Sequence, residues 1–191
     1  MSNFSGFEME SKYQQWDPGW YAGAIVPEYE TTGTFAKVIK TEDVVSTNGD
    51  SRNLKLAVVL VNGNKTDNKS VTYNYRTEAL SDDRKNYLRE AKKSGAQLGG
   101  SDFRDFMSLS RLNDLEKAGL TLEINGHGGF DTSKLVGTTA DFYLSIQKFT
   151  DETKKNSRAV TKEEMKSADE DERKSWFGKI TQIAKVDTKR K

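Results

Sequence analysis

The chain has 191 residues, with 30 basic and 29 acidic side chains, one histidine and no cysteine. This length allows one domain of ordinary size and excludes a large multidomain enzyme, and the lack of cysteine excludes disulfides, a thiol nucleophile and thiolate metal sites. The net charge of +1 removes the argument for nucleic-acid binding that a strongly basic chain would offer.

The first thirty residues are irregular in pattern and rich in aromatic side chains. Asp17-Pro18-Gly19 is a turn signal. Residues 20–26 favour a short strand that closes at Pro27, because proline lacks the N–H that a central strand needs. We expect residues 1–30 to form an N-terminal aromatic arm that packs on the main body and covers part of its core.

Two strands separated by a polar loop are predicted next. Residues 34–41 have the composition of a strand. Residues 54–61 form an apolar, β-branched run, which is typical of a central strand buried on both faces. The polar segment 43–52 between them favours a hairpin loop.

A third strand completes a predicted meander. Asn62-Gly63-Asn64 is a tight-turn signal, and residues 70–76 then alternate with period two. This alternation places Val71, Tyr73 and Tyr75 on one face of the strand.

Two helices are predicted after the meander. Ser81 is the expected N-cap of the first helix, whose acidic start and basic end suit the helix dipole. Ser101 or Asp102 is expected to cap the second helix, which runs to about Lys117. The helical insertion thus covers about residues 81–119.

Two further strands and a charged segment end the chain. Residues 136–149 alternate, with Phe142 on one face and Tyr143 on the other, and residues 176–186 form the predicted final strand. Between them, residues 150–174 are polar and charged, and their composition suits a weak helix or a long mobile loop equally. The acidic run within this segment, from Asp169 to Glu172, favours a solvated surface.

The element order predicts a mainly β protein with an α-helical insertion. Three strands, a helical insertion and two more strands is the order of an OB-fold, a five-stranded barrel with its helix between strands three and four. A sandwich or another small barrel has the same order. We assign residues 1–30 to the arm, 31–187 to an OB-fold-like domain and 188–191 to a basic tail.

The sequence offers little for catalysis. His127 lies in the flexible segment 125–129 among glycines, which is a poor place to fix a general base. The same segment lacks the Gly-Lys-Ser/Thr ending of a phosphate-binding loop. There is no cluster of metal ligands with convincing spacing. We expect no enzyme, no metal and no cofactor; a metal-dependent nuclease is the weakest alternative.

Single-stranded nucleic acid needs only cations for its phosphates and exposed rings for its bases. The candidate stacking residues are Phe35, Tyr73, Tyr75, Tyr143 and Trp176, and the candidate cations are Lys37, Lys40, Lys55, Arg76, Lys148, Lys179 and Lys185. For the two tyrosines at 73 and 75, a place in the core and contact with a base are equally compatible with the pattern. Trp176 is placed either to stack a base or to plug the end of the barrel. We predict the strongest exposure for Tyr143, which shares a face with polar residues.

Several segments resemble phage single-stranded DNA-binding proteins. They are Thr32–Val38, Asn53–Leu60, Leu135–Phe142 and Trp176–Ile180. The resemblance covers roughly residues 20 to 186 as a pattern of strands and glycines, and it carries no catalytic residue and no specific binding residue. It implies an OB-fold that coats single-stranded DNA during phage replication or recombination.

We therefore predict a sequence-independent single-stranded DNA-binding protein, with replication or recombination proteins as further partners and self-association compatible with the sequence. The alternative is a small β-barrel that binds another protein or inhibits a host enzyme. The longest apolar run, Leu56–Val61, is too short to span a bilayer, and residues 1–10 lack the regions of a signal peptide. We accordingly expect a cytoplasmic protein without membrane contact.

Overall fold

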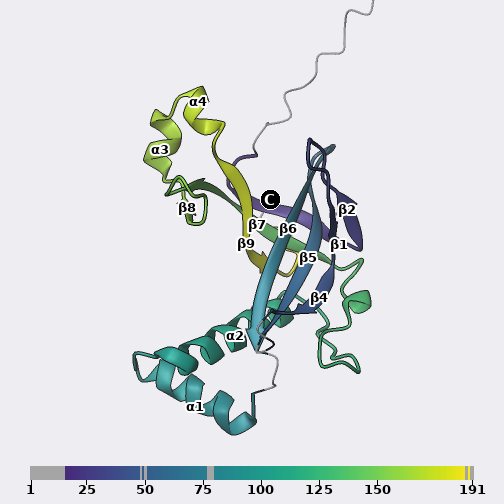
Figure 1. Ribbon diagram of the computed structural model, residues 1–191, viewed down its shortest axis with the longest axis vertical. Helices are drawn as coiled ribbons and strands as arrows, with labels where there is room; N and C mark the ends of the chain where they lie inside the picture. The colour runs from purple at the N-terminus through teal and green to yellow at the C-terminus, as the bar shows by residue number, and fades with distance from the viewer. Residues whose placement is uncertain (1–15, 48, 50, 77–79, 188, 190–191) are drawn as a thin grey trace, which may run out of the picture. The chain divides into compact units, whose positions relative to one another are not determined.

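A computed structural model describes residues 16–47, 49, 51–76, 80–187 and 189 (Figure 1). The chain divides into two compact units. The larger unit contains Trp20–Tyr143 and the residues from Ile180 onward, and the smaller one contains Leu144–Lys179. Residues 1–15, which include half of the expected N-terminal arm, lie outside the described residues.

The larger unit is built on a long antiparallel hairpin. Its strands, β5 (Ser51–Asn62) and β6 (Lys65–Arg76), pair along their full length from Asn62↔Lys65 onward. Gly63 makes the tight turn with a φ of 61°, a left-handed conformation that glycine adopts without steric cost. The short strand β4 (Glu42–Val45) pairs with the first half of β5. The predicted central strand and the turn after it are confirmed.

Strand β1 (Gly19–Val26) lies inside the sheet, because it pairs with β5 on one side and with β7 (Thr139–Phe149) on the other. Its residues therefore belong to the sheet and not to an arm on its surface. Strand β9 (Phe177–Ala184) pairs with β7, so hydrogen-bonded neighbours run in the order β6-β5-β1-β7-β9. No ladder among the described residues joins β6 to β9. The mainly β class is confirmed, whereas closure into a barrel is not.

A small hairpin replaces most of the strand predicted at residues 34–41. Strands β2 (Glu28–Glu30) and β3 (Val38–Lys40) pair with each other, and residues 31–37 form the loop that joins them. Thr31 closes this loop, since its N–H donates to the carbonyl oxygen of Lys37 at 2.8 Å and its hydroxyl oxygen accepts from the Lys37 N–H at 2.9 Å. The strand-like composition failed as a predictor here because the loop residues have no core to face.

The helical insertion is confirmed, with α1 at Asp82–Lys93 and α2 at Gly100–Lys117. Ser81 caps α1 as predicted, with its hydroxyl oxygen accepting from the N–H of Arg84. The predicted cap of α2 is wrong, because Gly99 occupies the N-cap position without a side-chain hydrogen bond. In Figure 1, α2 lies at the end of β6 and α1 lies beyond α2.

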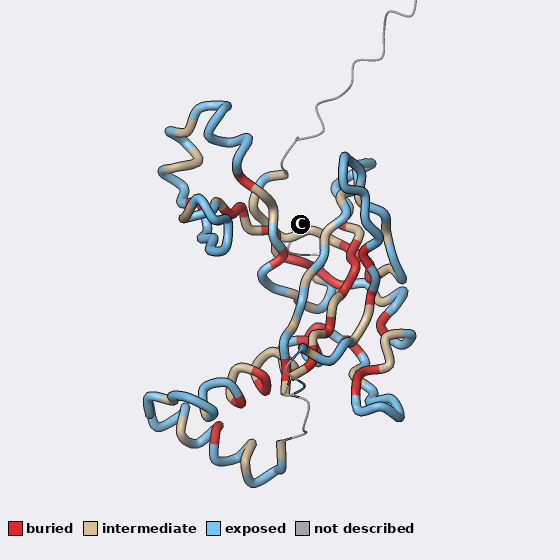
Figure 2. Tube along the Cα trace, viewed as in Figure 1, coloured by how far each residue is buried: buried red, intermediate tan, exposed pale blue. Residues whose placement is uncertain are grey.

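The core of the larger unit follows β5. Leu54, Leu56, Val58 and Leu60 have no exposed surface, and Ala57 on the opposite face is equally buried. Removing such side chains from water is the main favourable contribution to folding, about 25 cal/mol per Å² of apolar surface. Figure 2 shows this burial along the inner strands, in contrast to the mostly exposed helical hairpin.

The smaller unit orders the segment expected to be a loop or a weak helix. It contains β8 (Ser157–Ala159), α3 (Lys162–Ser167) and α4 (Glu170–Arg173). Thr161 and Glu164 form a capping box at the start of α3, in which each side chain accepts from the other residue's N–H. Ile146, Val160 and Trp176 form the buried core of this unit.

Two further details complete the described structure. The strand predicted from residue 136 begins at Thr139, because Gly137 adopts a φ of 88° in a turn that follows the single-turn helix η1 (Thr132–Lys134). Within the described ranges, no helix is both long and apolar enough to cross a membrane.

Candidate nucleic-acid interface

The twelve predicted site residues are divided between the two units. The larger unit contains Phe35, Lys37, Lys40, Lys55, Tyr73, Tyr75, Arg76, Tyr143 and Lys185, and the smaller one contains Lys148, Trp176 and Lys179. The surroundings of these residues differ within each unit.

Two of the five predicted stacking residues are buried in cores. Tyr75 is 5% exposed, its ring packs 4.8 Å from the ring of Phe130, and its hydroxyl donates to the carboxylate of Asp43. Trp176 is 9% exposed and packs in the core of the smaller unit. Neither ring offers a face to a base. The prediction that these two rings stack bases is therefore wrong. Both rings are large and apolar, and each packs in a core instead of facing the solvent.

The Tyr75 hydroxyl belongs to a buried ionic network that the sequence did not reveal. Arg52 Nε donates to Asp43 Oδ1 at 2.8 Å, and the two side chains are 7% and 2% exposed. The backbone N–H of Phe130 donates to Asp43 Oδ2 at 2.6 Å. Burial raises the pKa of Tyr75, and the hydrogen bond to Asp43 raises it further. This network fastens the loop before Phe130 to the sheet, which is a structural role.

The network also explains one glycine. A Cβ atom added to Gly129 would overlap the guanidinium of Arg52, so only a residue without a side chain allows this loop to close over the ion pair. The Gly128-Gly129 pair therefore serves packing as well as turn formation, with Gly128 at a φ of 77°.

The other two strand tyrosines are partly accessible. Tyr73 is half-buried beside Leu54, and burial is the main cause that raises its pKa, with the charge of Asp114 adding to it. Tyr143 is also half-buried and meets the ring of Trp20 edge-on, at 5.5 Å and 68°.

Most of the predicted strand cations are neutralised by carboxylates. Lys55 Nζ lies 3.2 Å from Glu42, and Arg76 Nε lies 3.3 Å from the buried Asp105. Lys148 Nζ lies between two carboxylates, 2.7 Å from Glu164 and 3.5 Å from Glu172. A phosphate would have to compete with these partners. Lys37 and Lys179 are exposed instead.

The tip of the β2–β3 hairpin combines an exposed ring with an exposed cation. The side chain of Phe35 is 91% exposed, and Lys37 stands two residues further along the same loop. The backbone of this loop is held by Thr31, as described above, so the ring is presented on a closed turn. Of the predicted site residues in the described structure, these two have the environment that stacking and phosphate contact require.

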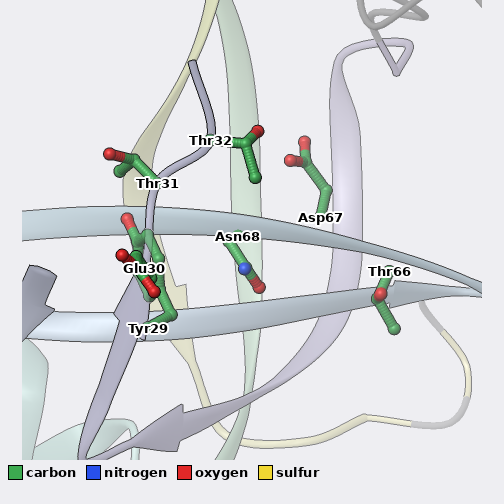
Figure 3. Close-up of a pocket in the computed structure, with 7 residues that line it drawn as sticks. All are labelled: Tyr29, Glu30, Thr31, Thr32, Thr66, Asp67 and Asn68. Atoms are coloured by element: carbon green, nitrogen blue, oxygen red, sulfur yellow. The ribbon is translucent and has the colours of Figure 1, made fainter. Parts of the chain in front are cut away.

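A polar pocket of about 330 Å³ lies between this hairpin and β6 (Figure 3). It is lined by Tyr29, Glu30, Thr31, Thr32, Thr66, Asp67 and Asn68. Lys69 pairs with Asp67 at 2.8 Å, whereas Glu30 has no ion-pair partner among the residues that the structure describes. Burial raises the pKa of Tyr29. The carboxylates repel phosphate, whereas the hydroxyls and the amide of Asn68 can hydrogen-bond the edge of a base.

A second cavity, of about 460 Å³, lies between the end of β6, the helices and the loop after α2. Its apolar lining includes Leu109, Leu112, Leu122 and Phe130, and Ile124 at its rim is 63% exposed. The charged side chains among its lining residues are Arg76, Lys85 and Glu116.

His127 is exposed in the turn after Ile124, and its backbone N–H donates to the side chain of Asn125 at 2.9 Å. Among the residues that the structure describes, no three histidine or acidic side chains gather as a metal site would require.

Comparisons with protein-family models, with curated proteins and with solved structures gave no match to this chain.

Proposed function

We propose that this protein binds single-stranded DNA without sequence preference, as an OB-fold-like protein of phage replication or recombination. The observation that carries the proposal is the strand order. If β1, β5, β6, β7 and β9 are counted as strands one to five, strand one pairs with two and four, strand two with three, and four with five. The helices fall between strands three and four, where an OB-fold has its helix.

This correspondence indicates where DNA would lie. OB-folds bind oligonucleotides on the face of strands two and three and with the loops between strands one and two and between four and five. Within the larger unit, these parts are β5, β6 and residues 27–50. The exposed Phe35 and Lys37 lie in the first of these loops, at the tip of the β2–β3 hairpin.

The face of β6 is suited to polar contacts. Every second residue from its start is exposed and small: Thr66, Asn68, Ser70, Thr72 and Asn74. These hydroxyl and amide groups carry no charge, but they can hydrogen-bond bases, sugars and phosphates. In the proposed mechanism Phe35 stacks a base, worth about 1–3 kcal/mol, Lys37 neutralises a phosphate, and the polar row on β6 accepts the strand without selecting a sequence.

A titration tests the proposal directly. The full chain is added to a fluorescent oligo-dT at several salt concentrations. The logarithm of the association constant should fall linearly with the logarithm of the salt concentration, with a slope of about −0.7 for each neutralised phosphate. The absence of binding at low salt would reject the proposal. Capture of a protein partner from nuclease-treated host lysate, together with no oligonucleotide binding, would favour the protein-interaction module or inhibitor instead.

A further inference from the structure

The helical hairpin carries cations that the sheet lacks. From Lys85 to the end of α1 the chain has four basic side chains and one acidic side chain, Glu90. Arg89, Lys92 and Lys93 are exposed, and none of them pairs with a carboxylate in the part of the chain that the structure describes. Their spacing of three and four residues gathers them along one side of the helix. The strand cations, by contrast, are mostly neutralised by acidic neighbours.

Exposed aromatic surface lies beside these cations. Phe103 and Phe106 are three residues apart on α2 and so share one side of that helix. The side chain of Phe103 is 51% exposed, and Lys92 Nζ lies 5.7 Å from the centre of the Phe106 ring. The contact between Lys92 and Phe106 joins the two helices' surfaces. We call Arg89, Lys92, Lys93, Phe103 and Phe106 the hairpin patch.

The hairpin is fastened to the strand on which the proposed interface depends. Ser108 Oγ of α2 accepts from the N–H of Arg76 at 3.1 Å, and Arg111 donates to the carbonyl oxygen of Asn74 at 3.2 Å. Inside the hairpin, Arg84 joins α1 to α2 through Asp102 and Asp105, at 2.6 and 2.9 Å. The patch is thus held on an ordered support at the end of β6.

We propose that the hairpin patch is a second contact surface for single-stranded DNA, in which a base stacks on Phe103 and phosphates lie against Arg89, Lys92 and Lys93. This inference rests on the proposed function, because the single-stranded DNA proposed to lie on β6 would continue onto the two helices. The charge of the patch fits a polyanion, and its exposed ring fits an unpaired base. The patch is therefore engaged only by strands long enough to continue beyond the sheet.

The test compares two lengths of oligo-dT on the full chain. One oligonucleotide fits a single OB-fold, which takes roughly 4–16 nucleotides, and the other is twice as long. The triple variant Arg89→Ala, Lys93→Ala, Phe103→Ala should weaken binding of the long strand about tenfold or more and leave the short strand unchanged. The salt slope for the long strand should fall by about 0.7 for each lost phosphate contact.

Two controls separate this patch from general effects of charge or exposed rings. Lys117→Ala with Lys134→Ala removes two exposed positive charges elsewhere on the same unit. Tyr87→Leu removes a ring that is 52% exposed on the same hairpin but has Arg84 over its face and Asp102 on its hydroxyl. Both controls should bind the long strand as the unaltered protein does, and circular dichroism should show the same melting for all variants.

Each outcome has one meaning. If the unaltered protein binds neither length, the proposed function fails. If it binds both and the triple variant binds the long strand equally well, the proposed function stands and the hairpin patch is refuted. An equal loss for the short strand, or an equal loss in the charge control, also overturns the patch as a second surface.

Discussion

Asp43 and Arg52 form an ion pair that is almost completely removed from water, with three further groups of the fold dependent on it. The Tyr75 hydroxyl and the Phe130 N–H both donate to Asp43, and Gly129 packs against the guanidinium of Arg52. Burial of two charges is tolerated only when their remaining hydrogen-bonding capacity is satisfied. The network therefore makes the loop before Phe130 part of the folded core.

Removal of one partner should be severe. We expect Asp43→Ala to lower the free energy of unfolding by about 3–5 kcal/mol, because Arg52 would remain buried without its counter-charge. The matched control is Glu42→Ala at the neighbouring position, whose partly exposed ion pair with Lys55 is worth about 0–1 kcal/mol. Urea unfolding followed by circular dichroism measures both, and equal losses would contradict the structural role given to Asp43.

Phe35 tests the proposed binding mode at a single ring. The side chain packs on nothing in the described fold, so Phe35→Leu should leave stability unchanged while it removes the flat face that a base needs. We expect a roughly five- to hundredfold loss of oligo-dT affinity, which corresponds to about 1–3 kcal/mol of stacking. Phe35→Trp should retain affinity. If Leu at this position binds as well as Phe, the hairpin tip does not stack a base.

At the scale of elements, the charged segment 150–174 is organised by Glu164. This carboxylate accepts from Arg158 Nη1 at 2.8 Å, from Lys148 at 2.7 Å and from the N–H of Thr161 at 2.9 Å. These contacts, led by Arg158, hold the pKa of Glu164 well below its ordinary value. They join β7, β8 and α3 within the smaller unit.

The pH dependence of this segment follows from the sign of that shift. Because the pKa is lower in the folded than in the unfolded chain, the stabilisation is complete above the ordinary glutamate pKa of about 4.3. It is lost progressively as the pH falls below that value towards the folded pKa. The protection factors of the α3 amides, which compare each exchange rate with its intrinsic rate at the same pH, should therefore fall below about pH 4.

A matched pair of variants isolates Glu164 in this experiment. We expect Glu164→Gln to accelerate exchange in α3 already at pH 7, because the acceptor of Arg158 and Lys148 loses its charge. Glu163→Gln, one residue earlier and exposed, should behave as the unaltered chain does. Identical exchange in both variants would show that the ion pairs do not order this segment.

These elements also show which parts of the fold can be predicted from local sequence patterns. The apolar run of residues that forms β5 and the N-cap at Ser81 are local patterns, and both were predicted from the sequence. Thr161 and Glu164 carry the spacing of a capping box, so α3 was also accessible from sequence. The Asp43–Phe130 contact joins residues 87 positions apart, and no local pattern encodes such a pairing. The strand expected at residues 34–41 is mostly a loop, because a strand-like composition does not reveal whether a core lies opposite the segment.

The candidate interface was predictable only in part, for a related reason. Aromatic residues on strands suit a core and a binding face equally well, and tertiary packing took Tyr75 and Trp176 into cores. Whether a lysine is neutralised likewise depends on which acidic side chains the fold brings near, as Glu42 comes near Lys55. The exposure of Phe35 and the patch on the helices emerge only from the three-dimensional arrangement.

At the scale of the whole molecule, the path β6-β5-β1-β7-β9 ends in β6 and β9. In the described part of the chain, β6 pairs only with β5 and β9 pairs only with β7. The two-residue turn at Gly63 fixes which groups of β6 face that open edge. Asn62 and Lys65 flank the turn as a hydrogen-bonded pair, so the odd-numbered residues of β6 bond to β5. Asn68, Ser70 and Thr72 direct their backbone groups outward.

This register makes the open edge measurable by amide hydrogen exchange. We expect the N–H groups of Asn68, Ser70 and Thr72 to exchange faster than those of Lys69 and Val71, which are bonded to β5. Equal protection of the two sets would show that β6 has a partner on its outer edge. Repeating the exchange measurement on diluted protein would then show whether that partner belongs to the same chain or to a second copy. Protection that persists on dilution would mean pairing with β9 and a closed barrel, whereas protection lost on dilution would mean edge pairing between two copies. Addition of oligo-dT leaves the exchange of Asn68, Ser70 and Thr72 unchanged if DNA lies on the face of the sheet, because a ligand on the face does not hydrogen-bond the N–H groups that point outward from the edge.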